Sequence, residues 1–319
     1  MGAVAQEVTI KGKVILKGTL TIPADRKEKF PAILLLAGSG SLDRDGNAKR
    51  GKLQLNIYKD LADFLTSIGF MTLRYDKRGV GESEGNVLEA GMYDLVDDAE
   101  AAYRFLKQHP QVDQERLIVL GHSEGAILAT ALNAREPLAG LILLSGAGAK
   151  LDKVMKQQQQ RVYSEMQQMD GIKGFLVRAF KVAEKAKKKN EALFAKVMTT
   201  DKDVIRVNGF IRINAKWLRE HFAYDLFADY RKITCPVLAI TGKKDIQVDA
   251  NELDHLPNYI VSPLEMHKID DMNHGLKVQK HDGSILNAKK EYVQDIGKEL
   301  HPKLQFILNE WLTENFKKE

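Results

Sequence analysis

The chain contains 319 residues, of which 44% are hydrophobic and 29% charged, enough for one large core with an insertion. Cys235 is the single cysteine, which excludes an intramolecular disulfide. No apolar run approaches the length of a membrane span, and Gln6 and Glu7 lie where a signal peptide would need an apolar core. We therefore expect a soluble, cytoplasmic protein without a membrane span.

The basic excess is confined to one segment. The formal net charge is +5, yet residues 149–230 hold 17 Lys+Arg against 10 Asp+Glu, and the remainder holds 31 against 33. No nucleic-acid-binding motif accompanies the basic segment. We therefore do not expect a nucleic-acid partner.

Strand and helix patterns alternate along the first half of the chain. Alternating polar and apolar residues over 6–22 predict an antiparallel hairpin at a sheet edge. Continuous apolar runs predict strands that are buried on both faces, as in a parallel sheet. The elements expected after the hairpin are strands at 30–37, 70–76, 117–122 and 138–145 and helices at 57–68, 92–108 and 126–132. This order predicts a doubly wound, mostly parallel α/β fold.

The alternation breaks after residue 148. Residues 149–230 lack a strand-like apolar run and show helical periodicity, so we expect a helical cap inserted over the carboxyl edge of the sheet. The strand pattern returns at 236–242 and 264–270, followed by a final amphipathic helix. The predicted core domain therefore comprises residues 1–148 and 231–319.

A Gly-x-Ser-x-Gly motif lies at 121–125, between an apolar strand and a helix-forming segment. The bare motif recurs by chance, but this context is the one that a nucleophile elbow requires. The glycines leave room where strand and helix pass closest, and the helix N-terminus favours a negative charge beside the serine. Ser123 is therefore the candidate nucleophile. His122 is expected to point away from it.

Two other loops carry residues that binding sites also use, one rich in glycine and one acidic. The glycines at 79–85 have the wrong spacing for a dinucleotide fingerprint, and the next helix begins too far away. The acidic turn at 43–46 lacks the remaining ligands of a calcium loop, which favours a structural turn. We therefore expect no cofactor and no metal.

A second motif reads Asp-x-Arg-Gly-x-Gly-x-Ser and spans residues 76–83. Together with the elbow, it resembles the α/β-hydrolase superfamily, and most the bacterial carboxylesterase and serine aminopeptidase-like branch. The resemblance covers nearly the whole chain outside the cap. It implies a triad in the order Ser, acid, His, with the acid after the seventh strand and the histidine after the eighth. These positions are Asp245, with Asp249 as its competitor, and His274.

The resemblance also implies an oxyanion hole of two backbone N–H groups. One belongs to Glu124, directly after the nucleophile. The other comes from the loop after the strand at 30–37, where Ser39 is the candidate and Gly40 the alternative. Ala37 replaces a histidine of the family pattern, but that histidine is not itself a donor to the oxyanion.

The sequence therefore predicts a cofactor-free serine hydrolase that cleaves small-molecule carboxylic esters through an acyl-enzyme. Thioesterase and aminopeptidase activities use the same groups and stay open, as does a homodimer. A non-catalytic binding protein on this fold is a further class, although no triad position is lost. Haloalkane or epoxide chemistry would need aspartate in place of Ser123. The basic cap suggests capture of acidic substrates or anionic surfaces, against the alternative of a merely solvated face.

Overall fold

A computed structural model describes residues 3–25, 28–48 and 53–317. Within these ranges, eight strands form one sheet in the order β1-β2-β6-β3-β7-β8-β11-β12. The strands of this sheet are β1 (Val4–Lys11), β2 (Ile15–Ile22), β3 (Phe30–Leu36), β6 (Met71–Tyr75), β7 (Val112–His122), β8 (Gly140–Leu144), β11 (Val237–Gly242) and β12 (Leu264–Ile269). The short strands β4 (Asn47–Ala48) and β5 (Leu53–Gln54) pair separately.

The sheet is antiparallel at one edge and parallel elsewhere. β1 pairs with β2 and β2 with β6 in antiparallel fashion. The pairs from β6 through β3, β7, β8 and β11 to β12 are all parallel. The expected edge hairpin and the buried parallel strands are therefore confirmed, and the carboxyl ends of the parallel strands meet at one edge.

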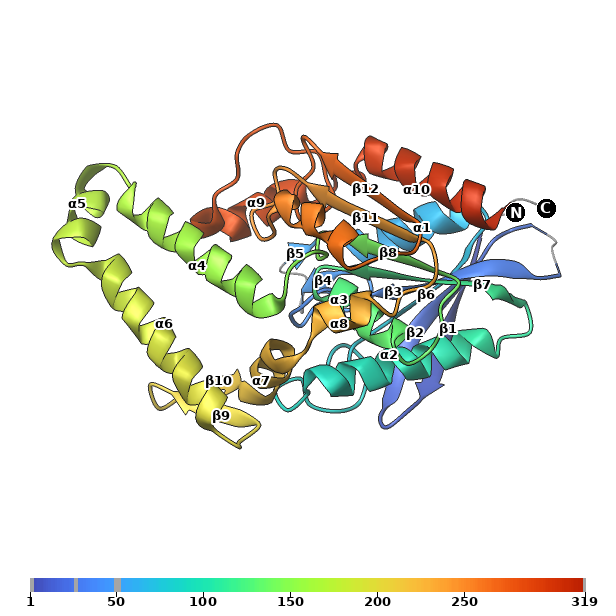
Figure 1. Cartoon of the computed structure of the whole chain (residues 1–319), viewed down its shortest axis with the longest axis horizontal. Coiled ribbons are helices and arrows are strands. Elements are labelled where there is room, and N and C mark those ends of the chain that lie inside the picture. Colours follow the sequence, from blue (N-terminus) through green and yellow to red (C-terminus); the bar gives the residue numbers. More distant parts are fainter. Residues whose placement is uncertain (1–2, 26–27, 49–52, 318–319) are drawn as a thin grey trace.

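Helices cover both faces of the sheet (Figure 1). The helices outside residues 149–225 are α1 (Ile57–Ser67), α2 (Met92–Lys107), α3 (Glu124–Asn133), α8 (Leu226–Tyr230), α9 (Ala288–Asp295) and α10 (Pro302–Phe316), with 3-10 helices at Ala250–Asn258 and Ile285–Asn287. None of the helices in the described ranges is long and apolar enough to cross a membrane.

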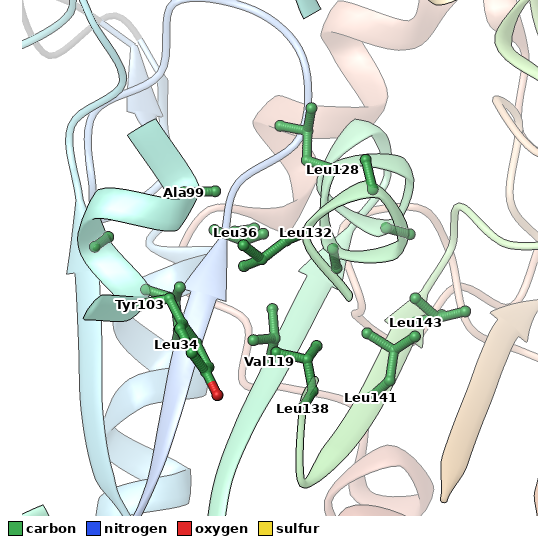
Figure 2. Packing of buried hydrophobic residues seen from close by; sticks show 14 of the residues in the cluster. Leu34, Leu36, Ala99, Tyr103, Val119, Leu128, Leu132, Leu138, Leu141 and Leu143 are labelled. Carbon is green, nitrogen blue, oxygen red and sulfur yellow. The ribbon is translucent and has the colours of Figure 1, made fainter. Parts of the chain in front are cut away.

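Alternate residues of each central strand enter two different cores. On β3, Leu34 and Leu36 pack toward α2 and α3, whereas Ile33 and Leu35 pack toward α1 and α10. Figure 2 shows the first of these cores, where side chains of β3, β7 and β8 meet those of α2 and α3. Burial on both faces explains why β3, β8 and the part of β7 from Leu117 onward read as apolar runs. Trp311, on α10, is buried in the second core.

The segment between β8 and β11 projects from the sheet (Figure 1). Its projecting elements are α4 (Leu151–Gln167), α5 (Gly171–Ala179), α6 (Val182–Thr199), β9 (Val204–Val207), β10 (Ile211–Asn214) and α7 (Ala215–Ala223). The hairpin β9–β10 departs from the helical expectation. Its turn contains Asn208 and Gly209, both with left-handed φ, of 51° and 81°. These are residues that such turns favour. α8 lies in the same segment but packs on α3 in the main core.

Candidate active site

Ser123 lies at the carboxyl end of β7, immediately before α3. Its backbone has φ 56° and ψ −122°, a strained conformation for a residue with a Cβ. A Cβ at Gly121 would overlap the Gly125 carbonyl, and one at Gly125 would overlap the Leu36 carbonyl. The predicted strand-turn-helix context and the steric role of both glycines are confirmed, and the half-buried Ser123 is displayed at the sheet edge.

Asp245 and His274 come together at the same edge. The Nδ1 atom of His274 lies 2.8 Å from Oδ2 of Asp245, and both residues are buried. The other oxygen, Oδ1, accepts the N–H groups of Gln247 and Val248 at 2.7 and 2.9 Å. Because a carboxylate only accepts hydrogen bonds, His274 carries its proton on Nδ1 and leaves Nε2 free to accept one.

The competitor Asp249 has a different position. It is exposed and caps the 3-10 helix at Ala250–Asn258, accepting the N–H of Asn251 at 2.9 Å. The structure therefore brings Asp245, and not Asp249, to His274. In the described part of the chain, no hydrogen bond joins Ser123 to His274, whose Nδ1 faces Asp245.

His122 takes part in a hydrogen-bonded chain that sequence reasoning missed. The Gly38 N–H donates to the Tyr58 hydroxyl at 2.7 Å, and this hydroxyl lies 3.1 Å from Nδ1 of His122. The Nε2 atom of His122 lies 2.9 Å from the carbonyl oxygen of His274. The carbonyl can only accept, so Nε2 carries the proton and Nδ1 accepts from Tyr58. This chain ties the loop after β3 to the backbone of His274.

Burial, with a smaller effect from His274, lowers the pKa of His122 from 6.5 to about 3. As the pH falls, His122 is therefore protonated in the unfolded chain before it is protonated in the folded chain. The free energy of unfolding decreases as a result once the pH falls below 6.5. Between pH 6.5 and 5, this residue alone should cost about 1.5–2 kcal/mol of unfolding free energy. His122→Gln keeps a donor and an acceptor without titrating, so its urea unfolding should lack this loss. Equal pH dependence of both proteins would contradict the inferred neutral His122.

A second missed group surrounds Glu124, whose side chain is buried directly after Ser123. Its carboxylate lies 3.5 Å from Nζ of Lys77, 3.2 Å from Nε2 of His221 and 2.5 Å from Nε1 of Trp217. Burial alone would raise the pKa of Glu124, but Lys77, His221 and Trp217 together lower it to about 2. Trp217 and His221 belong to α7, so the projecting segment is attached directly to the elbow.

Lys77 also holds the loop that carries the second predicted oxyanion donor. Its Nζ donates to the Gly38 carbonyl at 2.5 Å, while the N–H of Gly38 is held by Tyr58. A Cβ built on Gly38 would lie 3.0 Å from the Cβ of Ser123, so this loop borders the nucleophile position. Both backbone groups of Gly38 are therefore fixed by buried side chains.

The motif at 76–83 builds the scaffold behind this loop. The buried carboxylate of Asp76 accepts the N–H of Arg44 at 2.7 Å and the N–H of Glu82 at 3.1 Å. The hydroxyl of Ser83 donates to the Asp76 carbonyl at 2.6 Å. These contacts join the loop after β3 to the loop after β6, as does the ion pair between Arg44 and Asp76 at 3.0 Å.

A family model described as serine aminopeptidase, S33, matches residues 52–280. The chain belongs to this family. Esterase EstD of Thermotoga maritima is 29% identical over 243 residues, which is 76% of this chain and 52% of EstD. The chain thus spans about half the length of this curated relative.

Solved structures extend the likeness to the fold. Est1E of Butyrivibrio proteoclasticus matches with a TM-score of 0.61 and 16% identity, covering all of both chains. The Pyrococcus furiosus esterase PF2001 matches with a TM-score of 0.58 and 15% identity, covering 98% of this chain and 91% of that one. This S33 family member therefore has the α/β-hydrolase fold that the motifs predicted.

A polar cavity of about 710 Å³ lies between α4 and the loop after β11. Gln157 and Arg161 line it on one side, and Lys243 and Asp249 on the other. It borders Asp245, but neither Ser123 nor His274 is among its lining residues. The cavity is therefore not the space in which a scissile bond would meet Ser123.

The acidic turn at 43–46 and the single cysteine both have structural positions. Asp43 accepts the N–H groups of Asp45 and Asn47 at 3.0 and 2.9 Å, which makes the acidic loop a turn. Burial raises the pKa of the Cys235 thiol to about 11. In the described ranges, no cluster of three or more His, Cys, Asp or Glu residues could hold a metal ion.

Proposed function

We propose that this S33 family member is a serine hydrolase that cleaves carboxylic esters. Ser123 would be the nucleophile, His274 the general base and Asp245 the group that orients His274. The observation that carries the proposal is the arrangement of these three residues at one edge of the sheet. Ser123 has a strained backbone conformation there, and His274 donates a hydrogen bond to Asp245 at 2.8 Å. The likeness to EstD supports an ester as the substrate.

In the proposed reaction, Oγ of Ser123 attacks the ester carbonyl carbon while Nε2 of His274 takes the hydroxyl proton. Collapse of the tetrahedral intermediate breaks the bond to the alcohol oxygen, which receives that proton from His274. Water then attacks the acyl-enzyme, giving one proton to His274, which returns it to Ser123. Asp245 stabilises the imidazolium in both steps.

The backbone N–H groups of Ser39 and Glu124 would bind the oxyanion. The Gly38 carbonyl and the Ser39 N–H share one peptide unit, and cis peptides are absent from the described ranges. In a trans peptide these two groups point in opposite directions. The hydrogen bond from Lys77 to the Gly38 carbonyl therefore directs the Ser39 N–H away from Lys77. Because this hydrogen bond polarises the shared peptide unit, it also makes the Ser39 N–H a stronger donor.

Lys77→Met is accordingly expected to lower kcat by about tenfold to a hundredfold with little change in KM, because a loosened donor acts mainly on the transition state. Lys77→Met alone leaves the buried carboxylate of Glu124 without its lysine. The double variant Lys77→Met with Glu124→Gln removes both charges of the pair, so a loss of kcat that persists in it comes from the missing lysine and not from an unpaired carboxylate. Lys59→Met, which removes an exposed lysine paired with Asp63, is the matched control and should leave kcat unchanged. A normal kcat for both Lys77 variants would contradict the role.

An aminopeptidase activity is the second candidate, because of the family description. Such an enzyme must bind the ammonium group of its substrate. The carboxylate of Glu124, the residue directly after Ser123, is already engaged by Lys77, Trp217 and His221. This favours esters. A panel of p-nitrophenyl esters, acyl thioesters and aminoacyl p-nitroanilides tests the choice, and faster turnover of the anilides would overturn it.

The role of residues 149–230 as a cap is part of the same proposal. Arg161 on α4 donates to the Asp245 carbonyl at 3.3 Å, and Trp217 on α7 donates to Glu124. The segment thus contacts both the acid loop and the elbow, which supports a cap that shapes the acyl pocket. The cytoplasmic location and the homodimer stay predictions.

A further inference from the structure

The helix α5 lies at the tip of the projecting segment (Figure 1). Together with Phe180, which follows its last residue, α5 exposes an apolar stripe. The exposed fractions are 79% for Ile172, 65% for Phe175, 44% for Leu176 and 62% for Phe180. Their spacing places them on one helix face. On the opposite face Gly174 is buried, and a Cβ there would overlap the Met169 carbonyl. The stripe therefore faces outward while the other side of α5 lies against the preceding turn.

A strong positive charge surrounds this stripe. Residues 170–189 contain seven basic and two acidic residues, a net charge of +5, which equals that of the whole chain. The lysines at 187–189 are exposed on α6, directly after α5. Arg178 donates to the carbonyls of Gln167 and Met169, at 2.9 and 3.0 Å, and so fixes α5 to the end of α4.

We infer that α5 and the start of α6 form a docking surface for an anionic lipid bilayer. Exposed aromatic and aliphatic side chains on one face, with lysines beside them, are the features of helices that lie in a membrane interface. The apolar stripe enters the headgroup boundary, and the lysines are attracted to acidic headgroups. A second copy of the chain fits less well, because two surfaces of charge +5 repel each other. A nucleic acid would leave the apolar stripe unpaired.

Vesicle flotation with the full chain tests this inference. The protein should float with phosphatidylcholine vesicles that contain phosphatidylserine, and not with pure phosphatidylcholine vesicles. Phe175→Ser with Phe180→Ser should lower the bound fraction at least about tenfold. Changing the lysines at 187–189 to glutamine should lower it several-fold and reduce its sensitivity to salt.

Two control variants match these changes elsewhere on the chain. Phe306→Ser removes an aromatic side chain that is 65% exposed on α10, the same fraction as Phe175. Lys289→Gln with Lys290→Gln removes two exposed lysines of α9. Both should bind vesicles like the parent, and thermal unfolding should show that every variant is folded.

Absence of vesicle binding by the parent chain would overturn the inference, as would equal binding by the Phe175 and Phe180 double variant. Dimers in analytical ultracentrifugation that depend on Phe175 and Phe180, without vesicle binding, would identify a second copy as the occupant instead. Binding to duplex DNA in preference to the vesicles would also overturn it.

Discussion

Replacing Ser123 with alanine is expected to lower kcat for ester hydrolysis by at least about a thousandfold, because only substrate binding and the oxyanion hole would remain. The change removes one oxygen from a half-buried position whose φ of 56° is imposed by the surrounding turn, so the fold should persist. Steady-state kinetics with a p-nitrophenyl ester, alongside thermal unfolding, measures both quantities.

Ser39→Ala is the matched control for this experiment. Ser39 is proposed to act through its backbone N–H, which alanine keeps, so its kcat should stay close to that of the parent. Undiminished turnover by purified Ser123→Ala would remove Ser123 from the mechanism. A comparable loss in Ser39→Ala would show instead that the serine in the loop after β3 uses its side chain.

Asp245→Asn and His274→Ala are each expected to lower kcat by about a thousandfold or more. Asparagine keeps the shape of Asp245 but can donate to Nδ1 of His274, which favours the wrong tautomer. Since the two residues act on one proton transfer, the double variant should lose little more than the worse single variant. Kinetics of the three variants in parallel measures this coupling.

Asp249→Asn provides the matched aspartate control. Asp249 is exposed and caps a 3-10 helix, and asparagine caps helices nearly as well. Its activity should therefore be close to that of the parent. Additive losses in the double variant, or a large loss in Asp249→Asn with normal activity in Asp245→Asn, would contradict the proposed pairing of Asp245 with His274.

Much of the fold and the site follows from local sequence patterns. The strands β3 and β8, and β7 from Leu117 onward, are buried on both faces, so each reads as an apolar run without help from distant residues. The elbow is partly local, because a Cβ at Gly121 would meet the backbone of Gly125 just beyond Ser123, whereas one at Gly125 would meet the carbonyl of Leu36 on β3. The order of the elements then places the loops of Asp245 and His274 at the same sheet edge.

The features of the site that the sequence did not predict depend on contacts between residues far apart in the chain. His122 and His274 are 152 positions apart, and Glu124 and Trp217 are 93 apart. No local pattern distinguishes His122 or His221 from a solvated histidine, and the pairing of Lys77 with Glu124 needs two loops to converge. The hairpin β9–β10 did have a local signal, the Asn-Gly pair at 208–209, which the helical periodicity of its surroundings obscured.

The most direct test of the proposed mechanism is to locate the adduct of a fluorophosphonate probe by peptide mass spectrometry. A nucleophilic serine next to a general base reacts with this reagent, whereas ordinary serines do not. We expect one adduct per chain, on Ser123, and expect it to form much more slowly in His274→Ala. An adduct on another serine, or an unmodified Ser123 in a preparation that turns over esters, would contradict it.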